Sequence, residues 1–559
     1  MDTFSNEDSP RPFKAGIVTD LIDLDRELMK LLVRRAKLVG KLRGGKEHAA
    51  TPAAARAEKE VRTAWEKNAT SFSRDDKFAR QLFSLLQEIR MDSRADVEGR
   101  AAYNLSPARR PVNVNIPGPL SVSGTQMFAV LAAAFGDDMT LAGVMLNDPL
   151  MDTVKALNNA GAGFTWTVGA RLGEGVLTHA VGTKQFNMAT DKALYIGEEI
   201  FTAYLMAFLA AGRTGKARFT GGSGLKMADL SPLRRFLPDL GARFGHSVPK
   251  SNGLPGSVEA SGIIPDTITL PADLPREGVM ALFCVAATWK KVVKIDCGAL
   301  SLPLFTSALA ECLPVLRACG VADGMQGTVV TIDALRAAVP ASPVCPMDPL
   351  LVSYLLALPV FAGGRVSLAG EWEETLPSAK EALGLLAGEG LDVKPVTTAT
   401  GEKGIGAMVS ETKPAAVGAR DFSRLPERFL PLALAFSAHT VLRAKEGIPM
   451  PSLPENTDMA LAETFLAHVG VALRDGKLFP ASDESEKSPW TSPAPVWSIA
   501  YALCAYDTPN IGLTNHTAVT ALMPSFWALF NSLPDPSEKK EPVKKETTRR
   551  RIISRSDAE

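Results

Sequence analysis

The chain has 559 residues, of which 46% are hydrophobic and 22% charged, with 61 Lys and Arg against 61 Asp and Glu. This length is typical of about three domains, and the composition excludes a disordered or collagen-like chain. The balanced charge excludes a global field favouring nucleic acid or a membrane, so any anion site must be built locally.

Targeting signals and cysteine spacing exclude further classes of protein. The N-terminal residues show no signal pattern, and no uncharged apolar run reaches the ~18 residues of a membrane span. The longest such run, 200–212, predicts a buried helix. Six cysteines without a C-x-x-C pair indicate neither a disulfide framework nor a zinc site. We expect a cytoplasmic protein with no cofactor, no metal, no membrane and no nucleic-acid partner.

Residues 1–100 predict an all-helical domain. Apolar residues spaced alternately four and three apart mark one long amphipathic helix from Ile17, and capping signals at Thr51 and Ser73 mark two more. Arg35 stands at a core position of the first helix, where a buried guanidinium needs an anion. Alternatively, Arg35 extends past a loose helix pair to solvent.

A linker, 101–111, leads into a Gly/Pro-rich region, 112–533, that contains an internal repeat. Five apolar, helix-like stretches each end in a glycine followed by a strand-like start, about 70 to 80 residues apart. The glycines are Gly161, Gly241, Gly320, Gly390 and Gly470. Each is suited to the left-handed position that ends a helix before a strand.

This period predicts a mixed helix-and-strand unit, because it is too long for a solenoid repeat. The region has room for six units of roughly 70 residues, which we interpret as two three-unit halves. The tail, 534–559, is charged and nearly free of aromatic residues, and we expect it to be disordered.

Several segments of residues 112–530 resemble the EPSP synthase (3-phosphoshikimate 1-carboxyvinyltransferase) family. The segment 347–370 resembles the family's Gly-Asp-Ala-Ser-Ser-Ala-x-Tyr-Phe-Leu motif and keeps Asp348. The segment 116–128 resembles the Pro-Gly-Ser-Lys-Ser motif and keeps Ser121. Weaker resemblances lie in 146–162, 425–436 and 522–530.

The resemblance implies a mixed α/β fold with two lobes and six repeated helix/strand units. One lobe would comprise 121–345 and the other 112–120 with 346–533. It also implies an enolpyruvyl transferase of the shikimate pathway that joins two small-molecule substrates, phosphoenolpyruvate and shikimate 3-phosphate.

The resemblance also suggests site residues. Glu427 stands where the family has a catalytic Asp, and Glu455 where it has a catalytic Glu. Ser121, Arg276, Asp348 and Lys226 are the predicted substrate-binding residues. Arg276 and Lys226 lie near motif positions and would rebuild part of a cationic site, unless they are ordinary surface charges.

Several of the family's substrate-binding arginines and lysines are missing from this sequence. Three of its basic residues align with Leu120, Thr125 and Tyr204. Two polyanionic substrates require several fixed arginines and lysines. Three interpretations therefore stay open: the standard transferase, a transferase for a less charged substrate contacted by Glu198, Glu199 and Arg276, or a non-catalytic scaffold or regulator of aromatic amino-acid biosynthesis.

The first hundred residues resemble the helical chorismate mutase family, whose three helices intertwine as a dimer. Arg35 and Lys46 match two of its substrate-binding cations, whereas Val18 stands where the family has a further arginine. The resemblance implies the helical fold and a homodimer through this domain, but we expect no mutase activity.

Overall fold

The computed structural model describes residues 102–534, apart from 170–174, 181–185, 191, 249–250, 399–400, 411–419 and 482–487, and scattered helical positions between 24 and 65. One of these positions is Arg35, whose guanidinium lies 5.8 Å from the centre of the Trp65 ring. The predicted three-helix domain and its dimer, Lys46 and the predicted disordered tail lie outside the described residues.

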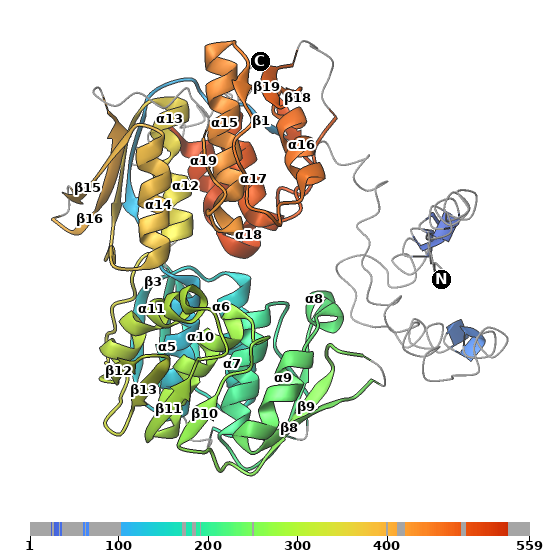
Figure 1. Cartoon of the computed structure of the whole chain (residues 1–559), viewed down its shortest axis with the longest axis vertical. Coiled ribbons are helices and arrows are strands. Elements are labelled where there is room, and N and C mark those ends of the chain that lie inside the picture. Colours follow the sequence, from blue (N-terminus) through green and yellow to red (C-terminus); the bar gives the residue numbers. More distant parts are fainter. Residues whose placement is uncertain are drawn as a thin grey trace, which may run out of the picture.

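Two lobes stand one above the other, each around its own apolar core (Figure 1). The lower core is built from residues between Met127 and Cys345. The upper core combines residues 105–114 and Met145 with residues from 347 onward. The chain therefore crosses between the lobes twice. The two crossings lie side by side, because Leu120 and Met347 form an antiparallel bridge.

The lower lobe contains three sheets with their helices. The first sheet has the order β3 (Met139–Val144), β5 (Gly175–His179), β4 (Phe164–Val168), with α5 (Val122–Phe135) and α6 (Asp148–Asn159). The second has the order β6 (Leu194–Tyr195), β7 (Gly215–Thr220), β9 (Gly256–Ala260), β8 (Ala242–His246), with α7 (Ile200–Ala211), α8 (Ser223–Met227), α9 (Ser231–Phe236) and η1 (Leu237–Leu240). The third has the order β10 (Thr267–Thr269), β11 (Val292–Asp296), β13 (Val329–Asp333), β12 (Ala322–Gln326), with α10 (Arg276–Ala286), η2 (Ala287–Trp289) and α11 (Leu302–Ala318).

The upper lobe repeats this arrangement. Its first sheet has the order β15 (Leu391–Thr397), β16 (Lys403–Val409), β14 (Gly364–Ala369), β2 (Val112–Pro117), with α12 (Pro349–Leu356), α13 (Leu358–Ala362) and α14 (Pro377–Gly388). The second has the order β17 (Ile448–Pro449), β19 (Lys477–Pro480), β18 (Val471–Arg474), with η3 (Glu427–Phe429), α15 (Leu430–Ala444) and α16 (Met459–His468). The third pairs β1 (Tyr103–Leu105) with β20 (Ile511–Leu513), beside α17 (Pro495–Cys504), α18 (Ala518–Leu522) and α19 (Phe526–Ser532).

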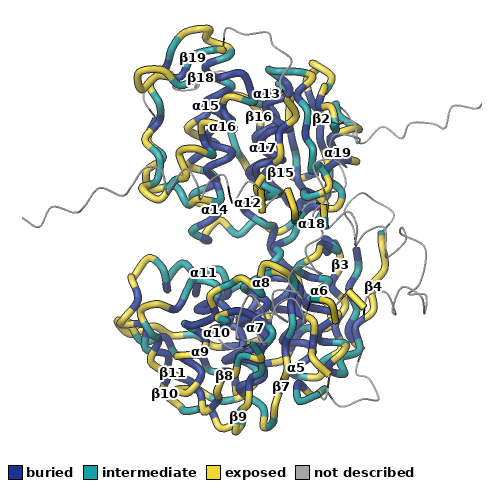
Figure 2. Tube along the Cα trace, turned by 90° about the vertical axis from the view of Figure 1, so that its right-hand side faces the viewer, coloured by how far each residue is buried: buried dark blue, intermediate teal, exposed yellow. Residues whose placement is uncertain are grey.

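Central helices fill both cores, and Figure 2 shows their buried traces gathered inside each lobe. The buried helix predicted at 200–212 is confirmed as α7, in which every residue after Ile200 is buried. A helix that is apolar on all sides is stable only inside such a core. The exposed traces in Figure 2 lie along the outer strands and loops.

The five repeat glycines have the backbone conformation that the sequence predicts. Their φ values are +102° at Gly161, +68° at Gly241, +72° at Gly320, +76° at Gly390 and +90° at Gly470. Each follows a helical turn and precedes a strand within a few residues. In this region of backbone space a side chain costs energy, so glycine is preferred.

Gly320 allows a direct test of this constraint. A Cβ added there would meet nothing closer than the Arg336 carbonyl oxygen at 4.0 Å, so only the backbone conformation opposes a side chain. We expect Gly320→Ala to lower the free energy of unfolding by about 1 to 2 kcal/mol, measured by urea denaturation. Gly320→Asn should cost less, since Asn tolerates this conformation better. Equal stability of all three proteins would contradict the assignment.

Candidate active site

The junction between the lobes is built around the two chain crossings. Asp348 caps α12, with its Oδ1 accepting hydrogen bonds from the Leu350 and Leu351 amides at 3.0 Å. Its Oδ2 accepts from the Val122 amide of the other crossing at 3.4 Å. Ser121 caps α5 through the Gly124 amide at 3.1 Å. The crossings thus bring Ser121 and Asp348 together.

Helix N-termini carry partial positive charge, so these two ends would favour an anion. At α12, the carboxylate of Asp348 already uses the free amides. Burial raises the pKa of Asp348, while hydrogen bonds from the Leu351 and Val122 amides act in the opposite direction. The α12 terminus is therefore occupied by the protein's own carboxylate.

Four charged side chains and one serine from the two lobes meet beside the crossings, and we call this group the inter-lobe cluster. It consists of Arg276, Glu311, Ser378, Glu381 and Arg428. Glu311 on α11 lies 3.5 Å from Nη2 of Arg276 in its own lobe and 3.9 Å from Nη2 of Arg428 in the upper lobe. The hydroxyl of Ser378 also donates to it.

Each arginine of the inter-lobe cluster has a second partner besides Glu311. Arg428 lies 3.6 Å from Glu381 of α14, and Arg276 donates from Nε to the Ser307 hydroxyl at 3.4 Å. Burial lowers the pKa of Arg276, and the nearby Arg428 adds to this effect. Burial raises the pKa of Glu381. The cluster therefore places two cations from opposite lobes around one carboxylate.

A second group of carboxylates lies on the lower lobe at α7 and α8. Glu198 is exposed and accepts hydrogen bonds from the Ser223 amide at 3.0 Å and the Gly224 amide at 2.6 Å. Glu199 accepts from Nε2 of Gln126 at 2.7 Å, and burial raises its pKa. Burial also raises the pKa of the neighbouring Asp152. Three carboxylates thus lie together on this side of the lobe, with Lys155 beside Asp152.

The resemblance would place arginines or lysines at three positions that hold uncharged side chains in this chain. Thr125 is buried, with its hydroxyl donating to the Val122 carbonyl at 2.8 Å, and Tyr204 lies wholly inside the lower core. Leu120 packs against the same core. These three side chains cannot hold a phosphate in the way that the resemblance implies.

The remaining predicted residues are scattered around the junction. Glu427 begins η3, directly before Arg428 of the inter-lobe cluster, and is exposed. Lys226 lies on α8, close in sequence to the amides that bind Glu198, and burial lowers its pKa. Glu455 is exposed in the loop before α16. The structure brings Arg276 close to the segment of Glu427, whereas Lys226 and Glu455 lie on other segments, α8 and the loop before α16.

Sequence reasoning missed Glu311 and Glu381. Glu311 interrupts an apolar helix, 302–318, and its side chain is only 9% exposed. A carboxylate on the apolar face of such a helix needs a partner. This pattern could have identified Glu311 from the sequence as a paired, buried carboxylate. The nearer cation, Arg276, comes from the same lobe, and the second, Arg428 on η3, is brought to Glu311 by the way the two lobes meet.

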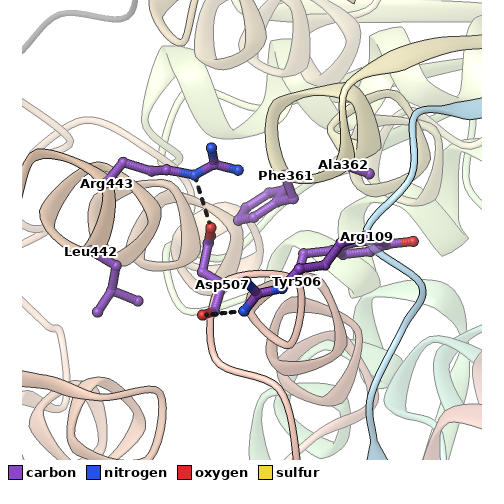
Figure 3. A pocket seen from close by; sticks show the side chains of 7 residues that line it. All are labelled: Arg109, Phe361, Ala362, Leu442, Arg443, Tyr506 and Asp507. Atoms are coloured by element: carbon purple, nitrogen blue, oxygen red, sulfur yellow. Dashed lines mark hydrogen bonds and ion pairs between the residues drawn. The ribbon is translucent and has the colours of Figure 1, made fainter.

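A pocket of about 450 Å³ lies elsewhere, at the C-terminal ends of α13, α15 and α17 (Figure 3). Asp507 accepts from Nε of Arg443 at 3.1 Å and lies 2.6 Å from Nδ1 of His439. Arg109 donates to the Asp507 carbonyl oxygen at 3.5 Å. Since α15 is about 22 Å long, Arg443 lies far from the cluster at the other end of this helix. Within this pocket, the Asp507 carboxylate pairs with Arg443 and contacts His439.

The described part of the chain contains no group of three or more His, Cys, Asp or Glu side chains arranged to hold a metal ion. Within the same residues, none of the helices combines the length and apolar character needed to cross a membrane. The six cysteines are buried and unpaired.

Solved structures of enolpyruvyl transferases share this architecture. An EPSP synthase from Acinetobacter baumannii matches with a TM-score of 0.57 and 15% identity, over 77% of this chain and 97% of that chain. A second structure of EPSP synthase from this organism gives 0.55 and 15%, over the same shares. The enolpyruvyl transferase NikO from Streptomyces tendae gives 0.52 and 16%, over 77% and 96%.

No protein-family model and no curated protein matches the chain. At 15% to 16% identity, the structural likeness establishes the fold alone. The mixed α/β, EPSP-synthase-like fold expected from the sequence is thereby confirmed for the large region. The substrate has to be argued from the side chains at the junction.

The inter-lobe cluster predicts a specific loss of stability. We expect Glu311→Gln to lower the free energy of unfolding by about 1 to 3 kcal/mol, because two partly buried guanidinium groups lose their shared anion. Urea denaturation measures the change. Glu259→Gln is the control, since Glu259 forms an exposed pair with Arg243 and should leave the midpoint nearly unchanged. An equal response of both variants would show that the cluster does not hold the lobes together.

Proposed function

We propose that the chain is an enolpyruvyl (carboxyvinyl) transferase whose acceptor, unlike shikimate 3-phosphate, carries no phosphate group. The observation that supports it most is the convergence of Arg276 and Arg428, from opposite lobes, on one carboxylate at the junction. This arrangement provides one anion site, where the standard reaction would need two.

Phosphoenolpyruvate suits this site by its charges. Its carboxylate and phosphate each form charge-assisted hydrogen bonds with guanidinium groups. The distances from Glu311 to Arg276 and Arg428, 3.5 and 3.9 Å, are longer than those of tight hydrogen bonds. A ligand anion can therefore compete with Glu311 for both arginines, while Glu311 keeps the hydrogen bond from the Ser378 hydroxyl.

The acidic side of the lower lobe argues for a neutral or cationic acceptor. The exposed Glu198 would repel a phosphate brought near it, because like charges at close range disfavour binding, whereas burial favours the neutral form of Glu199 and Asp152. Hydroxyl or ammonium groups would instead donate to these carboxylates. A polyhydroxylated or amino-substituted acceptor follows from this chemistry.

The reaction would proceed by addition and elimination. The acceptor hydroxyl adds to C2 of phosphoenolpyruvate while C3 takes up a proton, and the tetrahedral adduct then loses inorganic phosphate and the C3 proton to restore the double bond. These steps need positioned acids and bases. We assign them to Glu427, which neighbours Arg428, and to Glu455, following the resemblance.

A second candidate is a non-catalytic scaffold or regulator of aromatic amino-acid biosynthesis. It is favoured by the same cluster, because Glu311 and Glu381 already pair with both arginines. The standard reaction with shikimate 3-phosphate is the least supported alternative, since Leu120, Thr125 and Tyr204 cannot replace the family's cations.

Calorimetric titration with phosphoenolpyruvate tests the donor site. We expect binding that Arg276→Gln weakens about 10- to 100-fold, which corresponds to one charged hydrogen-bonding partner. Arg243→Gln is the matched control, because this exposed arginine pairs with Glu259 on β9. Absence of binding, or equal affinity of the two variants, would favour the scaffold.

Phosphate release measured with a panel of acceptors tests the reaction itself. We expect turnover with polyols or amino-polyols, little with shikimate 3-phosphate, and a loss of at least about 100-fold in Glu427→Gln with unchanged phosphoenolpyruvate affinity. Efficient turnover with shikimate 3-phosphate would instead establish the standard reaction and overturn the proposed acceptor.

A further inference from the structure

The pocket of Figure 3 lies in the upper lobe, and its lining shares no residue with the inter-lobe cluster. Its volume of about 450 Å³ is within the range of small-molecule sites. Three charged residues line it: Arg109 from the segment before β2, Arg443 from the last turn of α15, and Asp507 from the turn after α17. The lining therefore carries one positive charge in excess.

Asp507 presents no free carboxylate to this pocket. Its Oδ1 accepts from Nε of Arg443 at 3.1 Å, and its Oδ2 lies 2.6 Å from Nδ1 of His439. The Asp507 side chain is only 6% exposed. With both oxygens engaged and the side chain nearly covered, Asp507 holds Arg443 in place and opposes a ligand anion only weakly.

The two arginines keep most of their donors unused. Arg443 has 64% of its side chain exposed, and its Nη1 and Nη2 form no hydrogen bond within the described part of the chain. Arg109 is also exposed, and its contact to the Asp507 main-chain carbonyl is long, at 3.5 Å. Figure 3 shows the two guanidinium groups on opposite sides of Asp507. Since a guanidinium has five N–H donors, each arginine can bind one carboxylate of a ligand.

Helix ends supply acceptors beside the two arginines. Ala362 and Leu442 line the pocket from the last turns of α13 and α15. The carbonyl groups of a last helical turn have no intrahelical partner. In α15 the Lys445 amide takes the Val441 carbonyl, which leaves the carbonyls that follow it. Carbonyls at a helix C-terminus carry partial negative charge and favour an ammonium group.

The aromatic residues of the pocket offer little apolar surface to a ligand. Phe361 is 2% exposed and Tyr506 is 4% exposed. The gain from burying apolar surface is proportional to its area, so an apolar ligand would gain little here. The pocket therefore favours a small polar molecule that carries groups of both charges.

We propose that this pocket binds a small acidic amino acid, whose two carboxylates accept from Arg109 and Arg443 while its ammonium group donates to the carbonyls at the end of α15. Such a ligand has one negative charge in excess, which complements the lining. The site is independent of the transferase activity proposed above.

Titration calorimetry on the full chain with L-glutamate, glutarate and L-glutamine tests both parts of the proposal. Glutarate lacks the ammonium group, and L-glutamine lacks the second carboxylate. We expect L-glutamate to bind, and each of the other two compounds to bind at least about tenfold more weakly. No binding of L-glutamate, or equal binding of glutarate or L-glutamine, would overturn the proposal.

The variant Arg109→Gln separates binding from folding. Because Arg109 makes one long contact to a main-chain carbonyl, its removal should leave the urea midpoint nearly unchanged. It should nevertheless weaken L-glutamate at least about tenfold. Arg443→Gln should weaken L-glutamate by a similar factor, with His439 still in contact with Asp507. Unchanged L-glutamate affinity in Arg109→Gln would place the ligand elsewhere and contradict the assignment.

Arg276→Gln and Arg243→Gln serve as controls, because they alter the inter-lobe cluster and an exposed ion pair of the lower lobe. Both should bind L-glutamate as the unaltered chain does. A loss in Arg276→Gln as large as that in Arg109→Gln would place L-glutamate in the inter-lobe cluster, against the proposal. The measurement requires neither phosphoenolpyruvate nor turnover, so its result does not depend on the transferase activity.

Discussion

Glu311 lies in an apolar stretch of α11, keeps 9% of its side chain exposed and reaches cations of both lobes. A carboxylate so far removed from water must be paired, and the upper lobe supplies the Ser378 hydroxyl and the Arg428 guanidinium. This requirement links the orientation of the lobes to the electrostatics of the junction. Any ligand that binds the arginines changes the same contact.

Two further carboxylates near the junction accept hydrogen bonds from backbone amides at helix N-termini. Asp348 uses the amides at the start of α12, and Glu198 uses two amides at the start of α8. In an anion-binding cleft these backbone donors would be free for ligand oxygens. The EPSP-synthase-like fold is therefore combined here with a junction at which carboxylates of the protein use the backbone donors, which is the basis for proposing a less charged acceptor.

The buried pair of Arg420 and Glu389 illustrates a different use of charge. It lies at the side of the upper lobe, beside a pocket that two helical glycines keep open.

The sequence by itself determined the repeated unit and its helix ends. Gly161, Gly241 and the three other repeat glycines could be placed in the left-handed conformation from local pattern alone, because helix termination depends on a few neighbouring residues. The mixed fold and the buried helix at 200–212 followed from the same local signals. Only the tertiary structure decided which charges meet. Glu311 and Arg428 are distant in sequence and belong to different lobes, and the pairing of such residues is set by how the lobes pack, which no local pattern encodes.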